Sequence, residues 1–175
     1  MPVDSPHPFR AEGEAGPLER PEPGERPTNV IALTDVDPGT FPAAEVRALG
    51  AAAGSAQAGL NHVRLTPGSS GAPPHCHALE EELFVVLDGE GALELWPRGG
   101  GTPDPRPLDQ GDVVSCLPGT GVAHALRAGP EGMTYLAYGT RETSDMCFYP
   151  ESGRVSLRGL GIALRSPEID HLPGA

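Results

Sequence analysis

The sequence of 175 residues contains no lysine, so arginine supplies all 12 of its basic residues. A chain without lysine cannot form a lysine Schiff base with a carbonyl substrate or use a lysine amine as a general base. Acidic residues number 24, which gives a formal net charge of −12. A surface of this sign repels nucleic acids and anionic membranes, and we expect neither as a partner.

Cysteine is also scarce, with Cys76, Cys116 and Cys147 as an odd set that forms no CxxC pair. This pattern favours a reducing compartment over a disulfide framework, with each thiol a small buried apolar group. No apolar run approaches the ~20 residues that span a bilayer, and the first residues lack the features of a secretory signal. We therefore expect a cytoplasmic protein.

Glycine and proline are abundant, at 24 and 21 residues, and they favour short strands joined by turns. Residues 1–28 are rich in proline and acidic residues and poor in apolar ones. They predict an arm that is disordered or lies extended over another surface. Residues 29–175 are enough for a single domain with a core of its own.

The apolar pattern after residue 60 predicts many short strands, separated by turns that include Asp88-Gly89 and residues 129–132. Before it, residues 29–33 predict a strand and residues 41–49 a short helix. Residues 97–107 are predicted to be a loop. Many close strands with little helix indicate an all-β sandwich or barrel. Its candidate core residues are Phe84, Val86, Leu93, Leu95, Val113, Leu126 and Leu136.

Histidines and a carboxylate mark a candidate metal site. His75 and His77 are two apart, so in a strand they project from the same face while Cys76 points away. Glu82 begins the next apolar run, and His124 follows a Pro-Gly turn. Each residue alone has an ordinary structural explanation, because an HxH pair is common on exposed strands and single histidines often sit in a core. Their coincidence in one chain favours a metal site.

Imidazole and carboxylate ligands together suit Zn, Fe, Mn or Ni, and these residues do not select among them. Three imidazoles and one carboxylate leave room in an octahedral shell for water or substrate. Open positions distinguish a catalytic metal site from a closed structural one.

The spacing of these residues resembles the first motif of the cupin family, in which HxH is followed by a glutamate and then, after six residues, by a glycine. Here the motif is His75, His77, Glu82 and Gly89. The gap to Gly89 selects Glu82 over the adjacent glutamates 80 and 81.

The second cupin motif is similar to residues 111–124, with Gly111, Pro118, Gly121 and His124. It departs from the family by one residue at each of two gaps. Ala128 stands where the family has an asparagine, which is usually structural. The similarity covers about residues 60–140, and residues 134–155 also resemble small, single-domain bacterial cupins of unassigned function.

This resemblance implies an all-β fold, the cupin double-stranded β-helix or jelly-roll barrel, with an extended N-terminal arm and little helix. It implies that His75, His77, Glu82 and His124 bind one divalent transition-metal ion near one end of the barrel. We expect zinc in the purified protein. A homodimer is also implied, commonly with N-terminal segments packed across the interface.

The leading functional hypothesis is a metal-dependent isomerase, lyase or dioxygenase that acts on a small polar molecule, such as a sugar, sugar phosphate or organic acid. Phe84, Tyr135 and Tyr138 are candidate pocket residues, and no catalytic acid or base can be assigned. The alternatives are a cupin that binds or senses a small molecule without turnover, and a metal site that only stabilises the fold.

Overall fold

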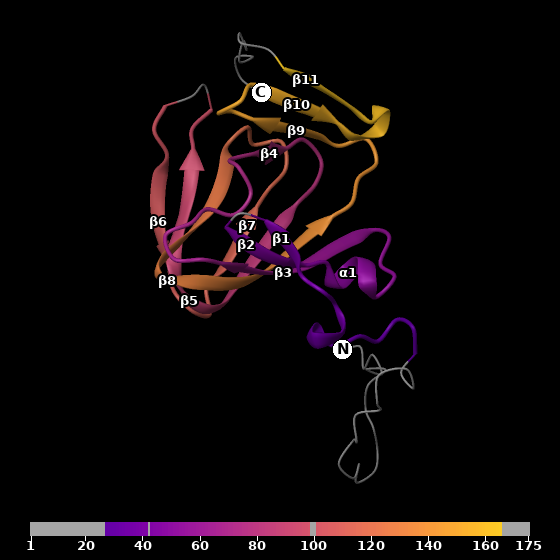
Figure 1. Ribbon diagram of the computed structural model, residues 1–175. Helices are drawn as coiled ribbons and strands as arrows, with labels where there is room; N and C mark the ends of the chain where they lie inside the picture. The colour runs from indigo at the N-terminus through magenta and orange to yellow at the C-terminus, as the bar shows by residue number, and fades with distance from the viewer. Residues whose placement is uncertain (1–26, 42, 99–100, 166–175) are drawn as a thin grey trace, which may run out of the picture.

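The computed structural model describes residues 27–41, 43–98 and 101–165, so the predicted arm at 1–28 lies almost wholly outside the described residues. Two antiparallel sheets form the molecule, and the smaller one lies across an end of the larger (Figure 1). The larger sheet has the order β1-β2-β3-β8-β5-β6, with β7 also paired to β5, and the smaller has the order β11-β10-β9-β4.

The strands are β1 (Gly39–Phe41), β2 (Ala44–Arg47), β3 (Ala58–Leu65), β4 (Cys76–His77), β5 (Glu82–Trp96), β6 (Asp104–Leu108), β7 (Val113–Cys116), β8 (Ala123–Thr140), β9 (Met146–Tyr149), β10 (Arg154–Leu157) and β11 (Ile162–Arg165). The helical segments are α1 (Leu49–Ala52) and two 3-10 turns, Leu33–Asp35 and Arg158–Leu160. No helix among the described residues is long and apolar enough to cross a membrane.

The long pair β5 and β8 organises the larger sheet and corrects two predicted turns. β5 does not reverse at Asp88-Gly89, and β8 continues through residues 129–132. The ladder between them shifts register between Val86 and Asp88 and again between Gly89 and Gly91. Bulges of this kind bend a strand pair and increase its twist. The glycine that suggested a hairpin therefore bends a continuous strand.

Three further sequence predictions were wrong in this region. Residues 29–33 form no strand, and the chain makes a 3-10 turn at Leu33–Asp35. Residues 44–47, predicted as helix, form β2, in which Ala44 pairs with Leu65 and Val46 with Val63. Pairing with the neighbouring strand β3 outweighs the helix propensity of the alanine, glutamate and arginine in this segment. Residues 104–108, predicted as loop, form β6 at the sheet edge, where prolines are tolerated.

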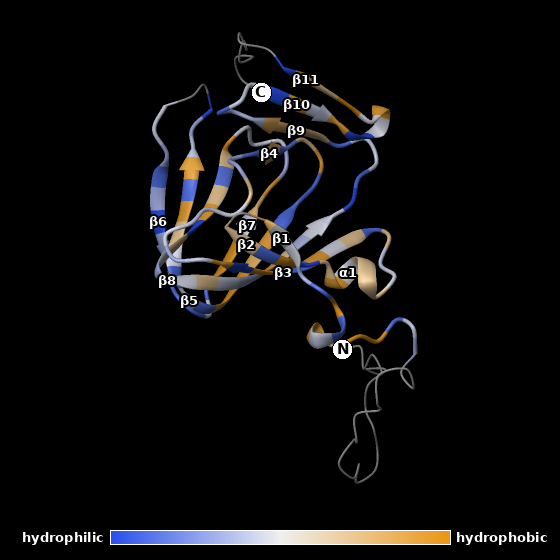
Figure 2. Cartoon of the chain, viewed as in Figure 1, coloured by the Kyte–Doolittle hydropathy of each residue, from blue (hydrophilic) through white to orange (hydrophobic). Residues whose placement is uncertain are grey.

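The core lies between the two halves of the bent ladder. In Figure 2 hydrophobic and hydrophilic segments alternate along the strands of the larger sheet. Phe84, Val86, Leu93 and Leu126 are buried as predicted. Val113 is 65% exposed, and Val114, which pairs with Phe84, takes its place in the core. The full buried cluster is Val63, Leu65, Phe84, Val86, Leu93, Leu108, Val114, Leu126, Ala128, Met133 and Tyr135.

Alanine substitution is expected to destabilise the protein by different amounts at Gly89 and Gly111, the glycines of the two cupin motifs. Gly89 has φ +78°, and a Cβ there would lie 2.3 Å from the carbonyl oxygen of Gly132. Gly111 has φ +95°, but a Cβ there would meet nothing within 4 Å. We expect Gly111→Ala to lower the free energy of unfolding by about 1–2 kcal/mol through backbone strain alone. Gly89→Ala should cost roughly 3 kcal/mol or more, because the steric clash adds to the strain. Equal losses in denaturant unfolding would contradict this role for Gly89.

Candidate metal centre

Backbone pairing sets two of the histidines side by side. The main chains of His75 and His124 exchange two hydrogen bonds, of 3.1 and 2.8 Å, in an isolated antiparallel bridge. Residues directly opposite in such a pair lie on the same face, and the two imidazole centroids are 4.8 Å apart. His77 is two residues further along and therefore on the same face, with its ring 5.1 Å from that of His75.

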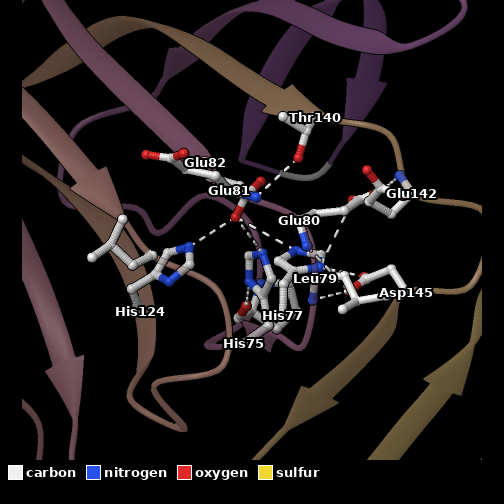
Figure 3. Close-up of polar contacts among 12 residues, drawn as sticks. His75, His77, Leu79, Glu80, Glu81, Glu82, His124, Thr140, Glu142 and Asp145 are labelled. Carbon is white, nitrogen blue, oxygen red and sulfur yellow. Dashed lines mark hydrogen bonds and ion pairs between the residues drawn. The ribbon is translucent and has the colours of Figure 1, made fainter.

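Glu82 completes the group from the first residue of β5. In the ladder it lies opposite Gly139, far along β8 from His124. The bend in the β5–β8 pair closes that separation. The Oε2 of Glu82 lies 2.9 Å from Nε2 of His124, 3.2 Å from Nε2 of His75 and 3.6 Å from Nε2 of His77 (Figure 3). The four residues selected from the sequence thus come together at one point.

In two of the imidazoles, the ring nitrogen that faces away from Glu82 contacts a hydrogen-bond acceptor. Nδ1 of His75 lies 2.8 Å from the carbonyl oxygen of Pro73, and Nδ1 of His77 lies 2.6 Å from Oδ2 of Asp145. A carbonyl or carboxylate oxygen accepts a hydrogen bond, so in each neutral ring the proton belongs on Nδ1. Nε2 then presents a lone pair toward Glu82. Metal-binding histidines characteristically have this arrangement.

The donor set fits a divalent transition-metal ion. Metal bonds of ~2.1 Å place neighbouring ligand atoms ~3 Å apart, and Glu82 Oε2 lies 2.9, 3.2 and 3.6 Å from the three nitrogens. Ligand atoms of His75, His77 and Glu82 all lie within 4.8 Å of one another, and His124 joins this group through Glu82. Lone pairs of two neutral imidazoles and a carboxylate repel one another unless a cation or protons lie between them. The side chains of His75, His77 and His124 are at most 10% exposed, so water provides little screening.

The charge state of the site also favours a cation. Burial alone would raise the pKa of Glu82, but without a metal ion the Nε2 atoms of His124 and His75 donate hydrogen bonds to it, which outweigh burial and hold that pKa well below its usual value. The carboxylate is therefore ionised at neutral pH. Burial would lower the pKa of His75, but its hydrogen bond with Glu82 raises that pKa above the ordinary value. A bound metal ion would take the place of these Nε2 protons. Burial lowers the pKa of His124 below its ordinary value despite the nearby carboxylate, which favours a neutral imidazole.

The glutamates beside Glu82 have other partners. The side chain of Glu80 is 1% exposed and receives two hydrogen bonds from the guanidinium of Arg158, one of them 2.9 Å long from Nη2 to Oε2. Glu81 accepts a hydrogen bond from the hydroxyl of Ser115 at 3.1 Å. Oε2 of Glu80 also lies 3.8 Å from Nδ1 of His77. Of the three glutamates, only Glu82 places a carboxylate oxygen against the Nε2 atoms of the histidines, and it is the residue that the spacing to Gly89 selects.

Asp145 is a functional candidate that the sequence did not indicate. It is 1% exposed, and its Oδ1 accepts hydrogen bonds from the backbone N–H of Leu79, at 2.9 Å, and of Glu80, at 3.4 Å. Its Oδ2 is thereby fixed against His77 (Figure 3). Asp145 is 68 residues from His77 in the chain, and no local pattern marks it.

Two cysteines lie across the strands from the candidate ligands but are poorly suited to bind metal. Cys116 pairs with Glu82, and Cys147 pairs with His77. Burial raises the pKa of Cys116 to about 12 and that of Cys147 to about 11. Without a metal ion both are therefore neutral thiols near pH 7, and neither belongs to a group of clustered donor atoms among the described residues.

The centre borders a cavity of about 500 Å³, which His75, Glu82 and His124 line. Phe84 and Tyr135, both named from the sequence as pocket residues, also line it. Tyr138 is 38% exposed and does not belong to the lining described for this cavity. It is three residues from Tyr135 along β8 and therefore projects from the opposite face.

Asp145→Asn is expected to weaken Zn²⁺ binding while the fold persists. The substitution replaces a charged acceptor behind His77 with an amide, and loss of such an outer partner typically costs about 10–100-fold in metal affinity. Competition with a chromophoric chelator measures the change. Asp104→Asn is the control, because the side chain of Asp104 is 60% exposed in β6. Wild-type affinity in Asp145→Asn would contradict a positioning role.

Comparison with known proteins identifies the domain. Residues 61–137 match the family model described as "Cupin domain". The chain carries a cupin domain. All four candidate ligands lie within the matched residues, and no curated protein matches the sequence significantly.

Solved structures support the same fold. A proposed sugar phosphate isomerase from Acidithiobacillus ferrooxidans has a TM-score of 0.68 and 22% identity, and the match covers 83% of this chain and 97% of that one. A sugar phosphate isomerase of the cupin superfamily from Silicibacter pomeroyi has a TM-score of 0.59 and 24% identity, with 72% and 84% covered. A Bacillus subtilis oxalate decarboxylase mutant matches with a TM-score of 0.52 and 19% identity, over 63% of this chain and 28% of that one. The protein has the cupin jelly-roll fold.

Proposed function

We propose that this cupin is a metal-dependent enzyme, with one divalent transition-metal ion bound by His75, His77, Glu82 and His124. The observation that carries the proposal is the convergence of three imidazole Nε2 atoms on one oxygen of Glu82, with Nδ1 of His75 and His77 tied to acceptors. We expect zinc as the ion in purified protein, although the donor set accepts Zn, Fe, Mn and Ni alike.

Access to the centre favours an enzyme over a closed structural site. Three of the four proposed ligands line a cavity of about 500 Å³, a volume within the range of small-molecule sites. A catalytic metal site keeps a position open to substrate, whereas a structural one is enclosed by protein ligands. The substrate classes predicted from the sequence, a sugar, sugar phosphate or organic acid, all carry oxygen atoms that such an ion binds.

The chain's own residues would prepare the site for reaction. A bound ion of this kind polarises a carbonyl or hydroxyl oxygen. Glu82 supplies negative charge in a buried setting, and Asp145 holds the ring of His77 in place. Phe84 packs 5.6 Å from the ring of His124 and excludes water from that side. Isomerisation, lyase chemistry and dioxygenation are the reaction classes compatible with this setting.

We further propose a cytoplasmic homodimer that binds no nucleic acid. The net charge of −12 supports the last point. Exposed apolar side chains on and beside β11 support a contact surface, namely Leu160, Ile162 and Leu164, which are 71%, 49% and 56% exposed.

The enzyme proposal is tested by turnover in a panel of aldoses, sugar phosphates and organic acids, with isomerisation, decarboxylation and oxygen uptake monitored. Protein loaded with Zn²⁺, Fe²⁺, Mn²⁺ or Ni²⁺ should convert at least one class, and the His124→Ala variant should not. Ligand binding without turnover for every ion would instead identify a binding protein. Metal that raises the melting temperature without binding any ligand would identify a structural site.

A further inference from the structure

The cavity beside the candidate metal centre is lined mainly by apolar side chains. Phe41, Val46, Val63, Phe84 and Leu126 are among them, together with several alanines. The polar atoms of the donor set lie along one part of this lining. Phe41 is 61% exposed and Ala72 is exposed as well, so these two residues mark the mouth of the cavity.

No arginine is among the residues described as lining this cavity, and the chain has no lysine. A phosphate group is normally bound by arginine, lysine or a helix N-terminus. Arg154 and Arg158 line a different pocket, of about 410 Å³, which His77 borders. Arg158 there is bound to the buried carboxylate of Glu80. Apart from the candidate metal centre, the described lining of the barrel cavity therefore offers no cationic side chain to a phosphate.

Two polar side chains stand out in the apolar lining. Asn61, Val63 and Leu65 are each two residues apart on β3, so their side chains project from the same inward face. Asn61 borders the cavity. Tyr135 is 5% exposed, and within the described part of the chain its hydroxyl has no hydrogen-bond partner. Burial raises the pKa of Tyr135, so the hydroxyl keeps its proton and can donate to a ligand.

The small number of polar side chains in the cavity lining limits how many hydroxyl groups a bound ligand can carry. Apart from the metal-centre residues, Asn61, Ser70 and Tyr135 are the only side chains described in the lining that can form hydrogen bonds. A sugar with a hydroxyl on nearly every carbon would leave several of them buried without partners, which disfavours binding. An apolar body loses nothing on entering such a cavity and gains from leaving water.

We propose that the cavity takes an organic acid with an apolar, ring-bearing or branched body, its acid group directed toward His75, Glu82 and His124. The body would lie along Val63 and Phe84, with one acceptor atom within reach of the Tyr135 hydroxyl. This inference rests on the proposed function, because it supplies the substrate class for the same metal centre. It selects the organic acid from the three classes named above.

The test compares three probes on Zn²⁺-loaded protein by calorimetry: phenylpyruvate, pyruvate and glucose 6-phosphate. Phenylpyruvate and pyruvate share a head group and differ by the ring. We expect phenylpyruvate to bind at least tenfold more tightly than either of the others. Equal affinity for phenylpyruvate and pyruvate would overturn the proposal, because the ring would then lie outside the cavity.

Two matched variants locate the bound ring. Ala72→Trp places a bulky group at the cavity mouth and should weaken phenylpyruvate binding at least tenfold. Ala163→Trp places the same group in the arginine-lined pocket and should leave that affinity unchanged. The reverse pattern would overturn the proposal. So would tighter binding of glucose 6-phosphate that Arg154→Ala abolishes, since the sugar phosphate would then use the arginine pocket.

A final measurement separates this inference from the proposed function. Toluene has the apolar body without the acid group and needs no metal. NMR shift changes of the Phe84 and Tyr135 rings in metal-free protein, lost in Ala72→Trp, would support the apolar specificity. Their absence would overturn that specificity while leaving the metal enzyme intact. If toluene entered the cavity but this protein bound no metal, the proposed function would be rejected and the apolar specificity of the cavity would stand.

Discussion

His124→Ala is expected to lower the affinity for Zn²⁺ by more than about 100-fold, beyond the loss typical of an outer partner of a metal ligand. The substitution removes the imidazole whose Nε2 lies 2.9 Å from Glu82, the shortest of the three separations. His124 is the only proposed ligand in the second motif, so the variant keeps only the three ligands of the first motif. Competition with chelators of graded strength measures the change.

His62→Ala is the matched control for this loss. His62 is half-buried on β3, its Nδ1 has no hydrogen-bond partner, and its side chain projects from the face opposite to Asn61 and Val63. We expect wild-type Zn²⁺ affinity in that variant. The predicted order of weakening is therefore His124→Ala, then Asp145→Asn, then His62→Ala. Retention of full affinity by His124→Ala would remove this histidine from the ligand set.

Arg158→Ala is expected to destabilise the fold more than any other single arginine substitution that the structure suggests. It leaves the carboxyl group of Glu80, whose side chain is 1% exposed, without its bidentate partner. Breaking a fully buried ion pair costs about 3–5 kcal/mol, and because the Arg158 side chain is 43% exposed we expect about 2–4 kcal/mol. The melting temperature should fall by roughly 5–12 °C.

The Arg158→Ala variant keeps one hydrogen bond to the buried carboxyl group of Glu80, which the backbone N–H of Glu142 donates at 2.8 Å. Arg106→Ala is the control, since Arg106 and its partner Asp104 are 64% and 60% exposed. Exposed pairs of this kind contribute about 0–1 kcal/mol. Similar melting temperatures for the two variants would show that Glu80 does not depend on Arg158.

Local patterns single out three of the four proposed ligands in the sequence. Strand parity places His75 and His77 on one face, and the gap between Glu82 and Gly89 distinguishes one glutamate from its neighbours. Parity would also have marked Asn61 as inward, since it alternates with Val63 and Leu65.

Other features depend on contacts that no local pattern encodes. Asp145 meets His77 across 68 residues, and Arg158 meets Glu80 across 78. The Asp88-Gly89 pair has the composition of a hairpin turn, and only the pairing of both flanking segments with β8 reveals a bend. For β2, pairing with the neighbouring strand β3 decides the conformation of a segment whose local propensity favours a helix.

The central claim is that a metal ion binds among three imidazoles and one carboxylate. X-ray absorption spectroscopy of the Zn²⁺-loaded protein tests it most directly. We expect one ion per chain, nitrogen and oxygen neighbours at ~2.0–2.2 Å, and the multiple scattering of imidazole rings. A sulfur neighbour at ~2.3 Å, as Cys116 or Cys147 would supply, or failure to retain any ion, would contradict the claim.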